Sequence, residues 1–224
     1  AYEIGMTKGL TDTTLGPDRT ATRAQAAAML VRIYEKLQQQ TAFVHGFYAI
    51  SSYSQLSLTQ SMDAVSAGWS RMVWDGTQAT LNTMEQDGNE YHIPSGYETV
   101  TAGISHLNLS VFMDGQDLKE MLASESGRTQ AMQEIVQEVS KVYDQIGENP
   151  YEGVTIDFEG LRAPQKEAFS DFLQQLHAAL QKLDKKLFVC VPPVLTSSAY
   201  YDGYDYRVIG NLADRVILMA YGYG

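Results

Sequence analysis

The stretch YEGVTIDFEG, residues 151–160, decides how this chain is expected to fold. Its apolar side chains occur at every second position, which is the period of a β-strand. Asp157 and Glu159 occupy the alternate positions, so both point to the opposite face from the apolar residues. Gly160 follows at once, and the acidic pair is therefore expected at the carboxyl end of a strand. The apolar members of the run are Val154, Ile156 and Phe158.

Five further apolar runs have the length and composition of strands. They cover residues 43–50, 69–74, 106–113, 187–194 and 215–221. Amphipathic helical patterns separate some of these runs, most clearly at residues 128–146 and 164–183. Strands that alternate with helices predict a parallel sheet, and nearly continuous apolar strands indicate burial on both faces.

This order predicts an α/β fold of the (β/α)8 barrel type that is incomplete, with about six of the eight units. A full barrel takes roughly 250 residues, whereas 224 are present here and the first 40 differ in character. The pattern alone leaves an open doubly wound sheet possible. Residues 76–104 are expected to form an excursion with a short hairpin. An unclosed sheet exposes an edge that could pair with a second copy of the chain.

Two neighbouring carboxyl groups at the end of a barrel strand have a chemical consequence. They repel one another, so one of them is expected to hold its proton more tightly. A carboxylic acid that stays protonated near neutral pH can act as a general acid. Acidic residues at strand ends also serve as helix caps or as solvated loop residues, and that alternative stays open. Their position beside buried apolar residues favours the catalytic interpretation, because burying charge is costly.

The composition restricts the partners. The formal net charge is −11, which disfavours nucleic acid and anionic membranes as partners, and no run of about 18 apolar residues predicts a membrane span. The single cysteine, Cys190, is expected to be a buried and unreactive thiol. The four histidines (His45, His92, His106 and His177) show no metal-binding spacing, so neither a metal nor another cofactor is expected.

The acidic run resembles the signature DGxDxDxE of family-18 glycoside hydrolases, the chitinase-like family. The sixth apolar run, LMAYGY, resembles the M-x-Y-D motif of the same family through Met219 and Tyr221. Further stretches, among them GFYAISSYSQL and VSAGWSRMVW, resemble the branch related to spore-cortex-lytic enzymes. The resemblance covers about residues 43–224. Thr155 stands where the family has its middle Asp, and Gly222 stands where it has an acidic residue after the tyrosine.

The resemblance implies a retaining, substrate-assisted glycosidase that acts on N-acetylglucosamine-type glycans such as peptidoglycan or chitin. Glu159 would be the general acid, Asp157 would orient the N-acetyl group, and Tyr221 would donate to the acetamido oxygen. Met219 would line the substrate site. Tyr48 and Trp74, at the ends of the first two strands, are candidates for stacking on a sugar, although core packing is an equal possibility for both.

Residues 1–40 are expected to form a separate, helical segment ahead of the barrel at 41–224. The stretch GMTKGLTDTTLGPDRTATRAQAAAMLVR resembles the second half of an S-layer homology repeat. Thr22 and Gln25 have the spacing of a capping box at a helix start. The resemblance implies that Arg23 binds a secondary polymer of the Gram-positive cell wall, although Arg23 could equally be a solvated first-turn residue.

Three hypotheses therefore follow from the sequence. The first is an extracellular, wall-associated glycosidase that needs no cofactor. The second is a glycan-binding protein with weak or no catalysis, which the departures at Thr155 and Gly222 motivate. The third is a structural wall protein that only holds the N-terminal segment outward.

Overall fold

The structure, a computed structural model, describes residue 20 and residues 22–37, 43–86, 89–102, 104, 106–195 and 201–221. The chain divides into two compact units, Ala1–Ala42 and Phe43–Gly224. Residues 1–19 of the predicted N-terminal segment and the residue Gly222 lie outside the described residues. No helix of the described chain is both long and apolar enough to cross a membrane.

The first unit contains helix α1 (Arg23–Leu37), which begins at the predicted capping box. The Thr22 amide donates to Gln25 Oε1 at 2.8 Å, and the Gln25 amide donates to Thr22 Oγ1 at 3.2 Å. These reciprocal bonds satisfy two amides that a helix start leaves without partners, so the predicted capping box is confirmed. Arg23 lies in the first turn and is exposed.

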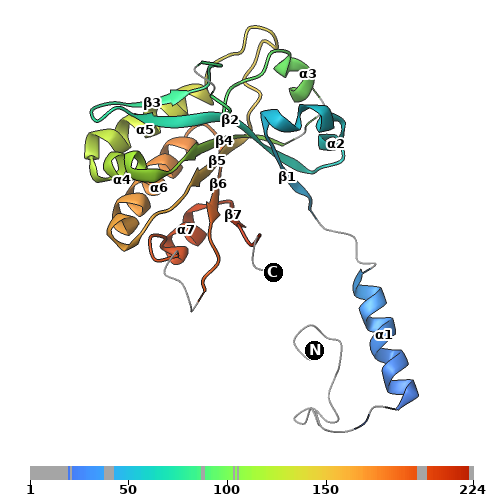
Figure 1. Ribbon diagram of the computed structural model, residues 1–224. Coiled ribbons are helices and arrows are strands. Elements are labelled where there is room, and N and C mark those ends of the chain that lie inside the picture. The colour runs from blue at the N-terminus through green and yellow to red at the C-terminus, as the bar shows by residue number, and fades with distance from the viewer. Residues whose placement is uncertain are drawn as a thin grey trace. The chain divides into compact units, whose positions relative to one another are not determined.

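The second unit is built on six parallel strands whose order in space follows their order in the chain (Figure 1). The sheet runs β1-β2-β4-β5-β6-β7, and β3 pairs antiparallel with β2 to form a hairpin. Because the order never reverses, the doubly wound alternative is wrong, and the predicted incomplete (β/α)8 barrel with six strands is confirmed. The strands are β1 (His45–Tyr48), β2 (Ala64–Trp74), β3 (Ala79–Asn82), β4 (Leu107–Met113), β5 (Gly153–Phe158), β6 (Lys186–Val191) and β7 (Arg215–Leu218).

Helices cover one face of the sheet, where α4, α5 and α6 lie together (Figure 1). The helical elements of this unit are η1 (Ile50–Gln55), α2 (Leu56–Thr59), α3 (Tyr97–Thr101), α4 (Gly115–Ala123), α5 (Glu125–Glu138), η2 (Ala163–Gln165), α6 (Lys166–Gln181) and α7 (Tyr206–Leu212). The apolar residues of β5 face these helices. Phe158, for example, stacks on Phe172 of α6 with ring centroids 5.4 Å apart. The alternate residues of β5, which include Asp157, therefore face the concave side of the half-barrel.

Several element boundaries differ from the sequence prediction, and three of these differences have a local cause. Strand β2 begins at Ala64 rather than at residue 69, because its first residues are mostly small and do not form an apolar run. Helix α5 ends at Glu138 rather than at residue 146. At this end the side-chain amide of Asn149 donates to the carbonyls of Glu138 and Lys141. Strand β6 ends before the Pro192–Pro193 pair, which has no amide hydrogens for a ladder.

Gly153 lets β5 approach its neighbours closely, and this contact predicts a stability effect. A Cβ atom at Gly153 would lie 2.3 Å from the Lys186 carbonyl oxygen and 2.8 Å from Asn108 Oδ1. We expect Gly153→Ala to lower the free energy of unfolding by on the order of 1–3 kcal/mol, because backbone must move to admit the methyl group. Urea denaturation followed by circular dichroism measures this change.

Gly210 on α7 provides the matched control, because a Cβ atom there meets nothing within 4 Å. Gly210→Ala should raise the free energy of unfolding by roughly 0.5–1 kcal/mol, since alanine loses less backbone entropy than glycine in a helix. Equal effects of the two substitutions would contradict the proposed packing of β5.

Candidate active site

The candidate site lies at the carboxyl end of β5. Thr155 and Asp157 face the concave side, and the Glu159 amide donates to the Met113 carbonyl at 2.9 Å, which extends the pairing with β4 by one residue. Gly160 then adopts a φ of +73°, a conformation that favours glycine, and turns the chain away from the sheet. Barrel enzymes place their catalytic groups at this end of the strands.

Asp157 is the more strongly perturbed of the two acids. Its pKa is raised to about 6, mainly by burial and also by the nearby charge of Glu159, while a hydrogen bond from the Cys190 thiol acts in the opposite direction. Its Oδ1 atom is buried and has no hydrogen-bond partner within the described part of the chain. Asp157 can therefore exchange a proton near neutral pH, and its buried oxygen is an acceptor whose hydrogen-bonding capacity is not met by the described residues.

Glu159 is also a weaker acid than an isolated glutamate. Burial raises its pKa, and the carboxylate of Asp114 adds to the shift. Asp114 follows β4 directly, so it stands beside Glu159 where the two strands end. Both carboxyl groups of the predicted pair therefore favour the protonated form more than usual, which is the property that a general acid needs.

A second group of side chains borders the acidic pair and was not singled out from the sequence. The strand register aligns Arg71 of β2 with Phe112 of β4, and Phe112 with Asp157 of β5. Tyr91 stacks on Phe112 with ring centroids 4.8 Å apart, and Arg71 Nη2 lies 3.0 Å from Asp114 Oδ1. Asp114 directly follows an expected strand, so the sequence could have indicated its place at the carboxyl end of the sheet. Nothing in the sequence indicated that Tyr91 lies beside Phe112.

Toward the amino ends of the strands from the acidic pair, hydroxyl groups lie on the concave side. Thr155 Oγ1 lies 2.6 Å from Ser66 Oγ of β2, and Ser66 Oγ lies 2.8 Å from His45 Nε2 of β1. Burial lowers the pKa of His45, and the charge of Arg215 lowers it further. Thr155 thus belongs to a chain of neutral groups, at the position where the family signature has a second aspartate.

The remaining predicted site residues lie in different environments. Met219 extends the pairing of β7 with β6, since its amide donates to the Val191 carbonyl at 2.9 Å. The Tyr221 side chain is 74% exposed, and its hydroxyl donates to Met219 Sδ at 3.5 Å. Tyr48 is buried and packs edge-to-face against Trp69 with ring centroids 6.1 Å apart. The described contacts of Tyr48 are thus those of a core residue.

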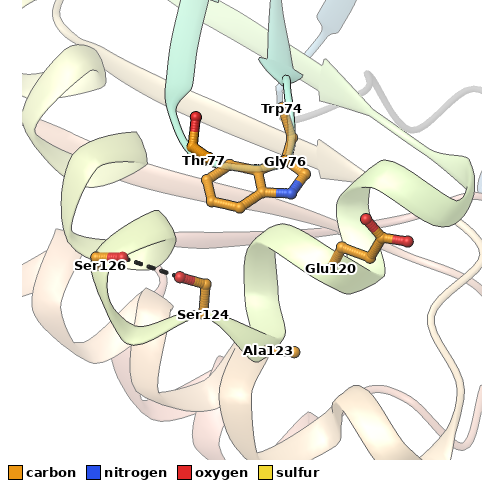
Figure 2. A pocket seen from close by; sticks show the side chains of 7 residues that line it. All are labelled: Trp74, Gly76, Thr77, Glu120, Ala123, Ser124 and Ser126. Atoms are coloured by element: carbon orange, nitrogen blue, oxygen red, sulfur yellow. Dashed lines mark hydrogen bonds between the residues drawn. The ribbon is translucent and has the colours of Figure 1, made fainter.

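Trp74 lies on the helix side of the sheet and not beside the acidic pair. Figure 2 shows its indole against α4 and the start of α5, in a shallow pocket of about 590 Å³ that also includes Glu120 and Thr77. Ser124 and Ser126, whose hydroxyls are 3.0 Å apart, line the same pocket. The indole is 8% exposed, so little of it is available to a sugar ring.

The histidines and carboxylates form no metal centre among the residues that the structure describes, where no group of three or more possible ligands occurs. Instead, the histidines with described hydrogen bonds have structural partners. His92 Nδ1 lies 2.7 Å from the Asn89 carbonyl oxygen, and His106 Nδ1 lies 2.7 Å from Glu152 Oε2. Cys190 is buried, as predicted.

Comparison with known proteins identifies the family. The profile of the glycosyl hydrolases family 18 matches residues 20–224, so the chain belongs to this family of glycosidases. YdhD of Bacillus subtilis, which is named as a sporulation-specific glycosylase, is 37% identical over 84 residues, or 37% of this chain and 20% of YdhD. The cortical fragment-lytic enzyme of Bacillus subtilis is 27% identical over 77 residues, or 33% of this chain and 18% of the enzyme.

A solved structure shows the same fold. The chitinase from Chromobacterium violaceum superposes with a TM-score of 0.62 at 21% identity, and the match covers 82% of this chain and 57% of that chitinase. The chain therefore spans little more than half of this structural neighbour, and its alignments cover about a fifth of each of the two Bacillus subtilis proteins.

The raised pKa of Asp157 predicts a pH-dependent stability. Since its pKa is about 6 in the folded chain and 3.8 when unperturbed, ionised Asp157 destabilises the fold, and this cost grows as the pH rises from 4 through 6. Asp157→Asn removes the cost. We expect the variant to be more stable than the wild type at pH 8, by on the order of 1–3 kcal/mol.

Urea denaturation at pH 8 and at pH 4 checks this expectation, because the difference between the two proteins should nearly vanish at pH 4. A variant that is less stable than the wild type at pH 8 would show that ionised Asp157 is well compensated in the fold.

Proposed function

We propose that this chain provides the catalytic acid of a glycosidase that cleaves β-linked N-acetylglucosamine-type glycans. The proposal is carried by one observation, which is that Asp157 and Glu159 meet at the carboxyl end of β5 in surroundings that raise both pKa values. Two such carboxyls on one face of a barrel strand suit proton donation to a glycosidic oxygen.

The proposed reaction is retaining and uses the substrate as its own nucleophile, which is a recognised exception to the two-carboxylate scheme. Glu159 gives its proton to the glycosidic oxygen as the bond to the anomeric carbon breaks. The acetamido oxygen of the same sugar forms the new bond to that carbon. A water molecule then attacks the anomeric carbon and opens the cyclic intermediate, and Glu159 takes a proton back from this water.

Asp157 and Tyr221 are proposed to hold the acetamido group during this step. The Asp157 residue is only partly buried, so its carboxylate can accept the amide hydrogen that becomes acidic in the intermediate. Tyr221 is exposed at the end of β7, where its hydroxyl can donate to a ligand, and Met219 lies beside it. Tyr48 and Trp74 are not proposed to stack on a sugar, because both are largely buried.

The glycan is proposed to be peptidoglycan-like, with chitin-like polymers as the second choice. Two of the similar proteins are named for sporulation or for cortex fragments, and these relatives have the higher identity to this chain. The chitinase similarity supports the fold and the chemistry, but its identity of 21% carries no argument for the substrate.

A glycan-binding protein with weak catalysis is the alternative. Its support is that Thr155 hydrogen-bonds to Ser66 through hydroxyl groups at 2.6 Å, so no second aspartate shares a proton with Asp157. Tight binding of N-acetylglucosamine oligomers without turnover would favour this alternative.

We also propose that the protein acts outside the cell and that its first unit binds a secondary cell-wall polymer, as a partial S-layer homology repeat. The support is the exposed Arg23 at the start of α1, whose guanidinium can pair with an anionic polymer. A homodimer through the open barrel edge remains a further proposal.

Substitution of the acid provides the main test. Glu159→Gln keeps the size of the side chain but cannot donate a carboxylic proton, so kcat on N-acetylglucosamine oligomers and muropeptides should fall by roughly 10²–10⁴-fold. Release of reducing ends measures the activity. Glu120→Gln on α4 is the control and should leave kcat unchanged. Full activity of Glu159→Gln would exclude Glu159 as the acid.

The wall-binding proposal has its own test. Arg23→Ala should reduce the fraction of protein that sediments with purified Gram-positive cell walls, because the substitution removes a cation near the anionic polymer, and added salt should have the same effect. Arg207→Ala on α7 is the control for net charge. Equal sedimentation of wild type and Arg23→Ala would reject a wall-binding role of Arg23.

A further inference from the structure

Arg71 faces the candidate site only because β2 contains a β-bulge. Ala67 is paired with Leu109, but Ser70 is paired with Val111, so three steps along β2 match two along β4. The extra residue reverses the alternation, and Arg71 therefore shares the concave face with its partner Phe112 instead of facing the helices. Bulges that re-aim a side chain are common beside functional sites.

The guanidinium of Arg71 is held in place but remains accessible. It lies 5.2 Å from the ring centroid of Phe112 and 5.7 Å from that of Tyr91, and the two rings are themselves stacked. The Arg71 side chain is 40% exposed, so the guanidinium remains in contact with solvent. The two rings therefore fix the position of a charge that points toward solvent.

Its ion pair with Asp114 leaves most of its hydrogen-bonding capacity for a ligand. One contact is described, from Arg71 Nη2 to Asp114 Oδ1 at 3.0 Å, and a guanidinium has five N–H donors. The Asp114 side chain is 49% exposed, and ion pairs at such exposure contribute only about 0–1 kcal/mol. A ligand carboxylate can therefore share or displace this contact at little cost.

We propose that Arg71 is a specificity-determining residue that binds a carboxylate of the glycan, so that the site prefers acidic amino sugars of the muramic acid type to neutral N-acetylglucosamine. The inference rests on the proposed function and names the substrate class of the same site. A planar guanidinium recognises a carboxylate through two parallel hydrogen bonds, which a neutral hydroxyl group cannot replace.

The spacing of the strands suits this assignment. Arg71, Phe112 and Asp157 lie on three adjacent strands at one level, and neighbouring strands are about 4.8 Å apart, so the two outer Cα atoms are separated by roughly 10 Å. A glycan whose acetamido group lies at Asp157 would extend past the stacked rings of Phe112 and Tyr91 toward Arg71. The long arginine side chain can then reach an acidic substituent on that sugar or on its neighbour.

The local charge explains why such a substrate needs an arginine. Asp114, Asp157 and Glu159 gather at the ends of β4 and β5, and an acidic sugar would be repelled by them. Arg71 is the cation whose contact with one of these carboxyls is described. It offsets part of the repulsion, whereas a neutral chitin-like chain gains nothing from it.

Binding measurements in a background that cannot turn over test the inference separately from catalysis. The full-length protein with Glu159→Gln is titrated calorimetrically with two oligosaccharides of equal length, one of N-acetylglucosamine alone and one that alternates N-acetylglucosamine with N-acetylmuramic acid. We expect tighter binding of the acidic oligomer. Arg71→Met, which keeps the length and apolar stem of the side chain, should weaken that binding roughly 10- to 100-fold and leave the neutral oligomer nearly unchanged.

Three controls complete the experiment. Arg71→Lys should retain only part of the preference, and Arg207→Met on α7 should retain all of it. The acidic oligomer with its carboxylates converted to methyl esters should bind the Glu159→Gln protein equally well with and without Arg71→Met. Circular dichroism of each variant verifies the fold.

Equal binding of both oligomers to the Glu159→Gln protein, or an equal loss of both on Arg71→Met, would overturn the inference while leaving glycan binding at this site intact. Binding of neither oligomer would instead overturn the inference together with the proposed function. A retained preference for the acidic oligomer in a wild-type protein that shows no turnover of either oligomer would count against the enzymatic proposal alone.

Discussion

The parallel pairing of β4 with β5 is the constraint on which the site depends. It brings Met113 and Glu159 into backbone contact at 2.9 Å and thereby places Asp114 beside Glu159. The same register sets Phe112 next to Asp157. Because side chains in register on neighbouring parallel strands share a face, one pairing determines both the acidic cluster and its aromatic neighbour. A shift by one residue would turn Asp157 toward the helices.

Burial then makes the acidic residues chemically useful. The apolar residues of β5 pack against α6, as the Phe158–Phe172 stack shows, and this packing holds the strand so that Asp157 is partly withdrawn from water. Loss of hydration is the largest cause of the raised pKa values of both Asp157 and Glu159. The core and the chemistry are thus linked, because the packing that stabilises β5 also determines the acidity of its terminal residues.

Much of the fold and the centre of the site could be predicted from the sequence, because both depend on local alternation. The run around Asp157 shows its two faces directly, and the succession of strands and helices indicates a barrel. The position of Arg71 could not be predicted, since it depends on a bulge that exists only in the pairing of β2 with β4. Trp74 was a candidate for stacking on a sugar because it lies at a strand end. In the structure this part of β2 pairs with β3 in the hairpin, and the indole lies against α4 and α5.

The ion pair of Arg71 and Asp114 links substrate charge to the acidity of Glu159. A cation near an acid normally lowers its pKa, yet the pKa of Glu159 is raised, and Asp114 is a cause of that shift. A ligand carboxylate that takes hydrogen bonds from Arg71 would leave Asp114 less compensated, and the negative charge near Glu159 would increase. Binding of an acidic sugar would then favour the protonated form of Glu159. Because the two equilibria are linked, protonation of Glu159 would favour binding of that sugar to the same extent. Substrate specificity and the protonation state of Glu159 would then both depend on the contact between Arg71 and Asp114.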